Sequence, residues 1–276
     1  MSEKSLREKK LVETEVEVFD GGWKKTNIIL TDQNLYLGTN KIPLGEIEDI
    51  EFVELEGLQG IKVKKDGDIV FSTHKKLLKQ IYRFLAYNLK SDRFAVFFLS
   101  PATVGGVVVK DVQWERGYLS VTEGGLWFLS PRKQIRISLE NLGSVGKDIR
   151  TVGGKQRVVL VLSHVERGEV ITSFILCPET TLEMLGDYIQ KLIDNRRPKA
   201  DLTEKEKQIL TLIYSGLESS SIESMLSIDS DELNKYYDSL VDHGLAKVVR
   251  IRKELELTAK GVALVNEIQK SQNIVG

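Results

Sequence analysis

The chain contains a stretch of sequence that is written twice, at a spacing that matches the size of a domain. Trp23 is followed at Thr31 by Thr-Asp-Gln-Asn-Leu-Tyr-Leu. Ninety-one positions further on, Trp114 is followed at Thr122 by Thr-Glu-Gly-Gly-Leu-Trp-Phe. Both copies continue into related apolar segments. Self-similarity at this period predicts two related domains in tandem, because the repeats of solenoid proteins are much shorter.

Each copy has the pattern of a small antiparallel sheet followed by one helix. Alternating apolar and polar residues predict about seven short strands per copy, since a half-buried strand has a period of two. A helical period follows over about residues 75–89 in the first copy and about residues 179–195 in the second. A β-barrel closed at one end by its helix is expected, and this outline is similar to the pleckstrin-homology-like (PH-like) fold. Trp23 and Trp114, at the start of the second strand of each copy, are expected in the cores.

A polar linker at residues 196–200 separates the two copies from a region with a different pattern. Thr203-Glu-Lys-Glu206 is a capping box, which begins a helix. Two further helices, a hairpin over residues 245–257 and a last helix from Thr258 predict a winged helix. We therefore expect an α+β chain of three domains: PH-like antiparallel β-barrels at residues 1–98 and 99–196, each capped by a C-terminal helix, and a winged helix at residues 200–276.

Composition indicates an ordinary globular protein. Hydrophobic residues make up 41% of the chain, and its net charge of −1 gives no field that would attract nucleic acid or an acidic membrane. The single cysteine, Cys177, excludes an internal disulfide and indicates a reducing compartment. The apolar stretch Phe94–Val109 is shorter than the about 20 residues of a membrane helix, so we expect two buried strands joined by a turn. A cytoplasmic protein without membrane insertion is expected.

The sequence contains no catalytic, cofactor or metal signature. Its three histidines, His74, His164 and His243, lie in different predicted elements without metal-ligand spacing. Gly153-Gly154-Lys155 lacks the earlier glycine and the Ser or Thr that a phosphate-binding loop requires, and predicts a hairpin turn. We therefore expect a protein that is not an enzyme and that holds neither cofactor nor metal.

The predicted winged helix raises the alternative of a DNA-binding transcription regulator with ligand-sensing β-domains. The segment Asp229–His243 contains five acidic residues against Lys235 alone, and residues 200–276 contain nine Lys and Arg against thirteen Asp and Glu. DNA binding depends on neutralising phosphates with Lys and Arg. These charges disfavour DNA as a partner and favour a winged helix that binds protein.

The predicted architecture, with no catalytic residues, resembles the archaeal chemotaxis adaptor CheF family. The resemblance extends from about Leu11 to Ile268. It is carried by the doubled segments Trp23–Leu37 and Trp114–Phe128 and by the run Leu257-Thr-Ala-Lys-Gly. The resemblance implies an adaptor that links the phosphorylated response regulator CheY to switch proteins of the archaellum motor. It transfers no binding residues, because the family has no short functional motif to match here.

Four residues of the predicted winged helix are candidates for binding CheY. Lys235 and Tyr236 lie on its third helix, and Arg250 and Arg252 lie on its wing. Aromatic and basic side chains are frequent anchors of protein interfaces. The alternative is that Tyr236 is a core residue and that the arginines are merely solvated.

A second candidate surface is the apolar run between the two repeats. Phe94, Phe97 and Phe98 concentrate there, and an exposed patch of this kind usually marks a contact. We expect these residues at an interface between the two barrels or between the subunits of a homodimer.

Overall fold

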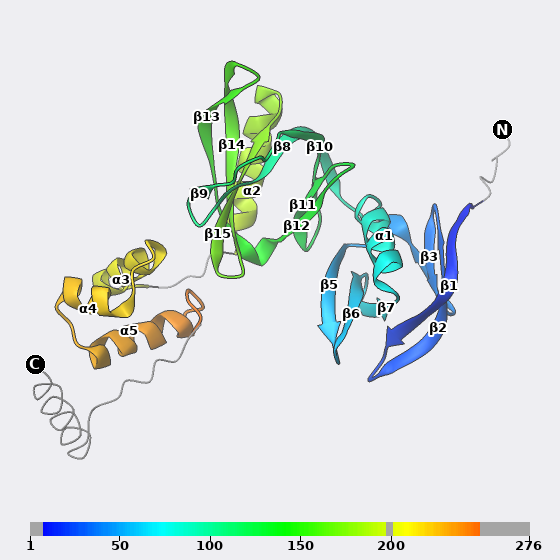
Figure 1. Ribbon diagram of the computed structural model, residues 1–276, viewed down its shortest axis with the longest axis horizontal. Coiled ribbons are helices and arrows are strands. Elements are labelled where there is room, and N and C mark those ends of the chain that lie inside the picture. The colour runs from blue at the N-terminus through cyan, green and yellow to red at the C-terminus, as the bar shows by residue number, and fades with distance from the viewer. Residues whose placement is uncertain (1–7, 197–200, 249–276) are drawn as a thin grey trace, which may run out of the picture. The chain divides into compact units, whose positions relative to one another are not determined.

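The computed structural model describes residues 8–196 and 201–248, and the chain divides into two compact units between Arg197 and Pro198. The first unit contains two antiparallel sheets with one helix each, and the second contains helices (Figure 1). The α+β class, with strands first and helices at the C-terminal side, is therefore confirmed.

The first sheet has seven antiparallel strands in the order β4-β3-β2-β1-β7-β6-β5. A 3-10 turn, η1 (Leu44–Glu46), joins β4 to β5, and helix α1 (Lys75–Ala86) follows β7. The helix covers the core of this sheet with Leu78, Ile81 and Leu85. The strands are β1 (Lys10–Phe19), β2 (Trp23–Thr31), β3 (Asn34–Leu37), β4 (Asn40–Pro43), β5 (Asp49–Leu55), β6 (Leu58–Lys64) and β7 (Asp68–Ser72).

The second sheet repeats this topology, with its path in the order β12-β11-β10-β8-β15-β14-β13 and β9 paired to β8. The turn η2 (Leu139–Asn141) and helix α2 (Glu179–Asp194) occupy the places of η1 and α1. The duplication read from the sequence is therefore also a duplication of strand order. The strands are β8 (Asp92–Val104), β9 (Val107–Val108), β10 (Glu115–Val121), β11 (Gly125–Leu129), β12 (Gln134–Ser138), β13 (Leu142–Val152), β14 (Lys155–Glu166) and β15 (Glu169–Leu176).

The repeated threonine has the same structural role in both copies. Thr31 Oγ1 accepts a hydrogen bond from the Asn34 N–H at 2.8 Å and lies 3.0 Å from the Asn34 carbonyl oxygen. Thr122 Oγ1 lies 3.0 Å from the Gly125 nitrogen and 2.9 Å from its carbonyl oxygen. A hydroxyl that bonds the backbone in this way stabilises the turn from β2 to β3 in the first copy and from β10 to β11 in the second.

The predicted closure of the sheets into barrels is not found. Strands β4 and β5 lie at opposite ends of the first sheet, as β12 and β13 do in the second, and no pairing joins them within the described residues. The turns η1 and η2 carry the chain from one edge to the other without backbone pairing, so each sheet stays open. The likeness to the PH-like fold and the division into three domains stay predictions.

Two expectations about burial are wrong. Trp23, the first residue of β2, and Trp114, just before β10, are half-buried and lie outside the core clusters of both sheets. The apolar run after Phe94 does form two strands joined by a turn, but Val107 and Val108 are each 71% exposed on the short edge strand β9.

The second unit contains helices α3 (Glu204–Tyr214), α4 (Ser219–Leu226) and α5 (Ser230–Asp242). The capping box is confirmed, since the Glu206 carboxylate accepts from the Thr203 N–H at 2.7 Å and Thr203 Oγ1 accepts from the Glu206 N–H at 3.3 Å. Hydrogen bonds from the Ser239 and Thr203 hydroxyls lower the pKa of Glu206 to about 2. Residues 245–248, the expected start of the wing, form no strand, and the rest of the wing lies outside the described residues. The winged helix stays a prediction.

Gly117 in β10 lies where a side chain would collide with the neighbouring strand. A Cβ at Gly117 would stand 2.1 Å from the Leu129 carbonyl oxygen and 3.1 Å from the Phe98 ring, whereas a Cβ at Gly146 in β13 would meet nothing within 4 Å. We expect Gly117→Ala to lower the free energy of unfolding by about 1–3 kcal/mol, because overpacking forces backbone shifts.

The control, Gly146→Ala, is expected to change the free energy of unfolding by less than about 0.5 kcal/mol. Urea denaturation measures both variants. If Gly117→Ala and Gly146→Ala have the same free energy of unfolding, the packing described for β10 is contradicted.

Candidate interaction sites

Strand β11 lies between the two hydrophobic cores of the first unit. All five of its residues are buried. Leu126 and Phe128 belong to the core of the second sheet, whereas Trp127 and Leu129 belong to the core of the first sheet. Successive side chains of a strand point to opposite faces, so one strand completes two cores. The two sheets therefore pack against each other through the side chains of β11.

A buried carboxylate, that of Asp49 at the start of β5, fixes this junction. Trp127 Nε1 donates to its Oδ1 at 3.0 Å, and Arg136 Nε donates to its Oδ2 at 2.9 Å. The same guanidinium makes a second hydrogen bond to Oδ2 through Nη2, and Thr122 Oγ1 lies 3.4 Å from Oδ1. All these partners come from the second sheet. The Asp49 side chain is only 1% exposed, so its charge has to be paired. Its partner Arg136 belongs to the other repeat, and the ion pair therefore links the two repeats.

The surroundings of Asp49 are adapted to this ion pair. A Cβ on Gly124 would stand 2.3 Å from Asp49 Oδ2, so the close approach requires glycine. Burial disfavours the charge of Arg136, but the hydrogen bonds and charge of Asp49 outweigh it and raise the pKa of Arg136. The ring of Tyr82 on α1 lies 5.6 Å from that of Trp127. Burial raises the pKa of the Tyr82 hydroxyl.

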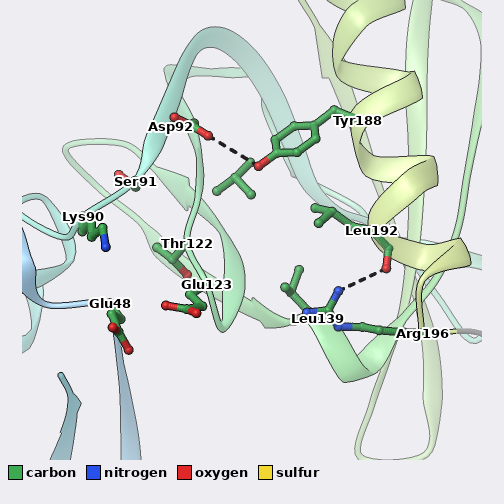
Figure 2. Close-up of a pocket in the computed structure, with 11 residues that line it drawn as sticks. Glu48, Lys90, Ser91, Asp92, Thr122, Glu123, Leu139, Tyr188, Leu192 and Arg196 are labelled. Atoms are coloured by element: carbon green, nitrogen blue, oxygen red, sulfur yellow. Dashed lines mark hydrogen bonds between the residues drawn. The ribbon is translucent and has the colours of Figure 1, made fainter. Parts of the chain in front are cut away.

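A cavity of about 450 Å³ is also present in the first unit (Figure 2). Tyr188 on α2 points toward Asp92 and donates a hydrogen bond to its carboxylate at 3.4 Å. Burial and the Asp92 carboxylate raise the pKa of the Tyr188 hydroxyl. Three carboxylates and two cations line the cavity, so their charges largely cancel and give no strong field that would select an ion. Its charged lining residues are Glu48, Lys90, Asp92, Glu123 and Arg196.

No group of three or more His, Cys, Asp or Glu side chains that could hold a metal occurs in residues 8–196 and 201–248. In the same ranges, no helix is long and apolar enough to cross a membrane. Cys177 has a free thiol, whose pKa is raised by burial.

The three phenylalanines expected at an interface have different positions on β8. Phe98 is fully buried and stacks on Phe128, with the ring centroids 4.9 Å apart. Phe94 is half-buried against the same core. Phe97 is 46% exposed and lines a groove of about 490 Å³ together with Arg116 and other residues. The interface stays a prediction, with Phe97 as its exposed member.

Of the four residues expected to bind CheY, two fall within the described residues. Lys235 is exposed on α5. Tyr236 is half-buried against the core of the helical unit, and its hydroxyl donates to Glu232 at 3.2 Å. Tyr236 therefore serves partly as a core residue. Arg250 and Arg252 lie outside the described residues.

The helical unit exposes apolar side chains that the sequence analysis did not single out. Tyr214 is 76% exposed at the end of α3, and Met225 is 64% exposed on α4. Met225 and Leu212 line a groove of about 320 Å³. Tyr214 lies five residues after the buried Ile209 and so on another side of α3, which is the helical signal that could have identified it, whereas Met225 lies only three residues after the buried Ile222 and carried no such signal.

Removing the buried carboxylate is expected to destabilise the first unit. Asp49→Ala leaves Arg136 buried, with Glu51 at 3.6 Å as the remaining counter-charge in the described residues. We expect the free energy of unfolding to fall by about 3–5 kcal/mol, as when one partner of a buried ion pair is removed. Denaturation followed by tryptophan fluorescence measures the change.

Asp148→Ala is the matched control, because it removes an exposed partner of Arg150 on β13. An exposed pair contributes about 0–1 kcal/mol. If both aspartate variants lose the same stability, Asp49 does not fix the junction.

The homodimer expectation depends on Phe97. If copies of the chain associate through this side chain, the wild type has the mass of a dimer in light scattering and Phe97→Asp has the mass of a monomer. Val107→Asp, a charge placed on exposed β9, is the control and should keep the wild-type mass. Identical masses for wild type and Phe97→Asp would rule out this interface.

Comparison with known proteins identifies the family. A family model described as Archaeal Chemotaxis signal transduction system protein F matches residues 9–195, and a domain of unknown function (DUF8579) matches residues 201–270. The chain is also similar to the Taxis protein CheF1 of Halobacterium salinarum, with 24% identity over 260 residues that cover 90% of this chain and 89% of the relative. The first match spans more than half of the chain and covers both sheets. The chain therefore belongs to the archaeal chemotaxis protein F (CheF) family, and it is a protein of archaeal chemotaxis signal transduction.

Proposed function

We propose that the protein is a non-enzymatic adaptor that links phosphorylated CheY to the switch proteins of the archaellum motor through protein contacts. Membership of the chemotaxis family is the observation that carries this proposal. An adaptor needs surfaces for two partners, and the chain offers two compact units with separate cores. Such an adaptor would work in the cytoplasm.

We infer further that the chain has the three-domain organisation expected from its sequence. The shared order of strands and the single helix after each sheet support PH-like domains at residues 1–98 and 99–196. The three helices and the capping box support a winged helix at residues 200–276.

The helical unit is the proposed binding site for CheY. Phosphorylation shifts a receiver domain between two conformations, and a partner that prefers one of them binds it more tightly in proportion to that preference. Lys235 is exposed on α5 and can contribute a basic anchor, with Arg250 and Arg252 as its proposed companions. Tyr236, the next residue in the sequence, is half-buried, so part of its ring is exposed and can contribute to the same contact.

The alternative of a DNA-binding regulator is not favoured by the charges of α5. This helix exposes Asp231, Asp238 and Asp242 together with Lys235. A helix with this excess of carboxylates repels phosphates, whereas both specific and non-specific DNA binding require their neutralisation.

Titration calorimetry of the full chain with CheY, with and without beryllium fluoride as a phosphoryl mimic, tests the adaptor function. We expect at least about tenfold tighter binding to the mimic-bound form, equivalent to about 1.4 kcal/mol. Charge reversal at Lys235, Arg250 and Arg252 should weaken this binding. Charge reversal at Lys207 on α3 is the matched control and should not. Equal affinity for both forms of CheY, or no binding, would refute the proposal.

A further inference from the structure

The first sheet contains a second version of the site that receives Asp49. In the second sheet, Trp127 on β11 lies directly opposite Arg136 on β12. In the first sheet, Tyr36 on β3 lies directly opposite Lys41 on β4. Thr31 stands at the start of this hairpin as Thr122 does in the second. Each repeat therefore places a hydroxyl, an aromatic side chain with a polar hydrogen and a cation at equivalent positions.

The first of these sites also holds a carboxylate, that of Glu8. Asn34 Nδ2 donates to Glu8 Oε1 at 2.7 Å, and the Tyr36 hydroxyl donates to Oε2 at 3.1 Å. Thr31 Oγ1 lies 2.5 Å from Oε1. The hydrogen bonds from Thr31 and Asn34 are the main reason that the pKa of Glu8 is lowered, with smaller contributions from Tyr36 and Lys41. The site therefore stabilises an ionised carboxylate.

The two bound carboxylates differ in burial. Asp49 is enclosed between two cores, whereas Glu8 is exposed at the start of the described chain, before β1. Two of the residues that bind Glu8 are nevertheless fixed in place, because Thr31 and Asn34 are buried and the Asn34 N–H donates a hydrogen bond to Thr31 Oγ1. A preformed site with an exposed occupant needs little rearrangement to exchange that occupant.

We propose that Thr31, Asn34, Tyr36 and Lys41 form a docking site for an aspartate or glutamate side chain of a partner protein, which replaces Glu8. The second repeat shows the kind of contact, since there Thr122, Trp127 and Arg136, the equivalents of Thr31, Tyr36 and Lys41, surround a carboxylate that the other sheet presents from the beginning of β5. This site lies on the first unit, so it adds a surface to the adaptor that is separate from α5.

The position of Asp49 in a second copy of this chain cannot supply the occupant. Asp49 lies five positions after Leu44, the start of η1, and the equivalent residue after η2 is Ser144, which has no carboxylate. Asp49 itself is held by Arg136 and Trp127 of its own chain. The occupant that we propose is a side chain of a different protein that presents an acidic residue at the beginning of a strand, as β5 presents Asp49.

The probe for this site is N-acetyl-aspartate N-methylamide, with the asparagine analogue as its neutral counterpart. Nuclear magnetic resonance follows the side-chain amide of Asn34 and the ring of Tyr36 in the full-length chain. In Glu8→Ala we expect saturable shifts of these signals with the aspartate probe at millimolar concentration, a range expected for so small a ligand. The asparagine probe should bind at least several-fold more weakly.

Glu13→Ala, which removes another exposed glutamate of the same strand region, is the matched control. We expect it to behave like the wild type, in which Glu8 competes and the aspartate probe gives little shift. No saturable shift in Glu8→Ala, equal binding of the two probes, or the same response in Glu13→Ala would overturn the proposal.

Two variants made in the Glu8→Ala background test the Tyr36 hydroxyl and the Lys41 charge. Lys41→Gln removes the cation at an exposed position, and Tyr36→Phe removes one hydroxyl, so both should keep the fold. Each should weaken binding of the aspartate probe several-fold, while the unperturbed resonances report an intact sheet. Unchanged affinity in both variants would also overturn the proposal.

Discussion

The arrangement of the first unit depends on satisfying one buried carboxylate. Desolvating a charge costs several kcal/mol, and only well-placed donors offset that cost. The donors to Asp49 are the Trp127 indole and the Arg136 guanidinium, which lie on adjacent strands of the other sheet. A shift of one sheet against the other would separate the buried Asp49 from both of these donors. The ion pair thus fixes the contact that Trp127 and Leu129 make with the first core.

Local chemistry explains how much of this fold could be predicted. The strand periods, the two amphipathic helices and the capping box at Thr203 depend on neighbours in sequence, and the structure contains all of them. Closure of the sheets depends on pairing between distant edges, which no local period encodes, and no such pairing is found among the described strands. Among the tryptophans, Trp127 is the fully buried one, while Trp23 and Trp114 are half-buried. The signal for Trp127 was the unbroken apolar run of β11, which is typical of a strand buried on both faces.

The candidate site residues show the same division between local and distant causes. Alternation along β8 separates Val96 and Phe98, which face the core, from Phe97, which does not, so grouping the phenylalanines overlooked a signal that was present. Tyr236 lies three residues after Leu233 and four before Leu240, both buried, which accounts for its half-buried position. Asp49 carried no such signal. It stands among other acidic residues, and only the approach of the second sheet distinguishes it.

The difference between Lys41 and Arg136 has a kinetic consequence. A guanidinium is planar and weakly hydrated and forms two directed bonds to a carboxylate, whereas an ammonium is compact, strongly hydrated and carried on a flexible stem. Differences in affinity between related contacts lie mainly in their dissociation rates. After duplication, the copy with arginine suits a contact that remains closed for the life of the folded chain. The copy with lysine suits one that opens and closes at the pace of a signal.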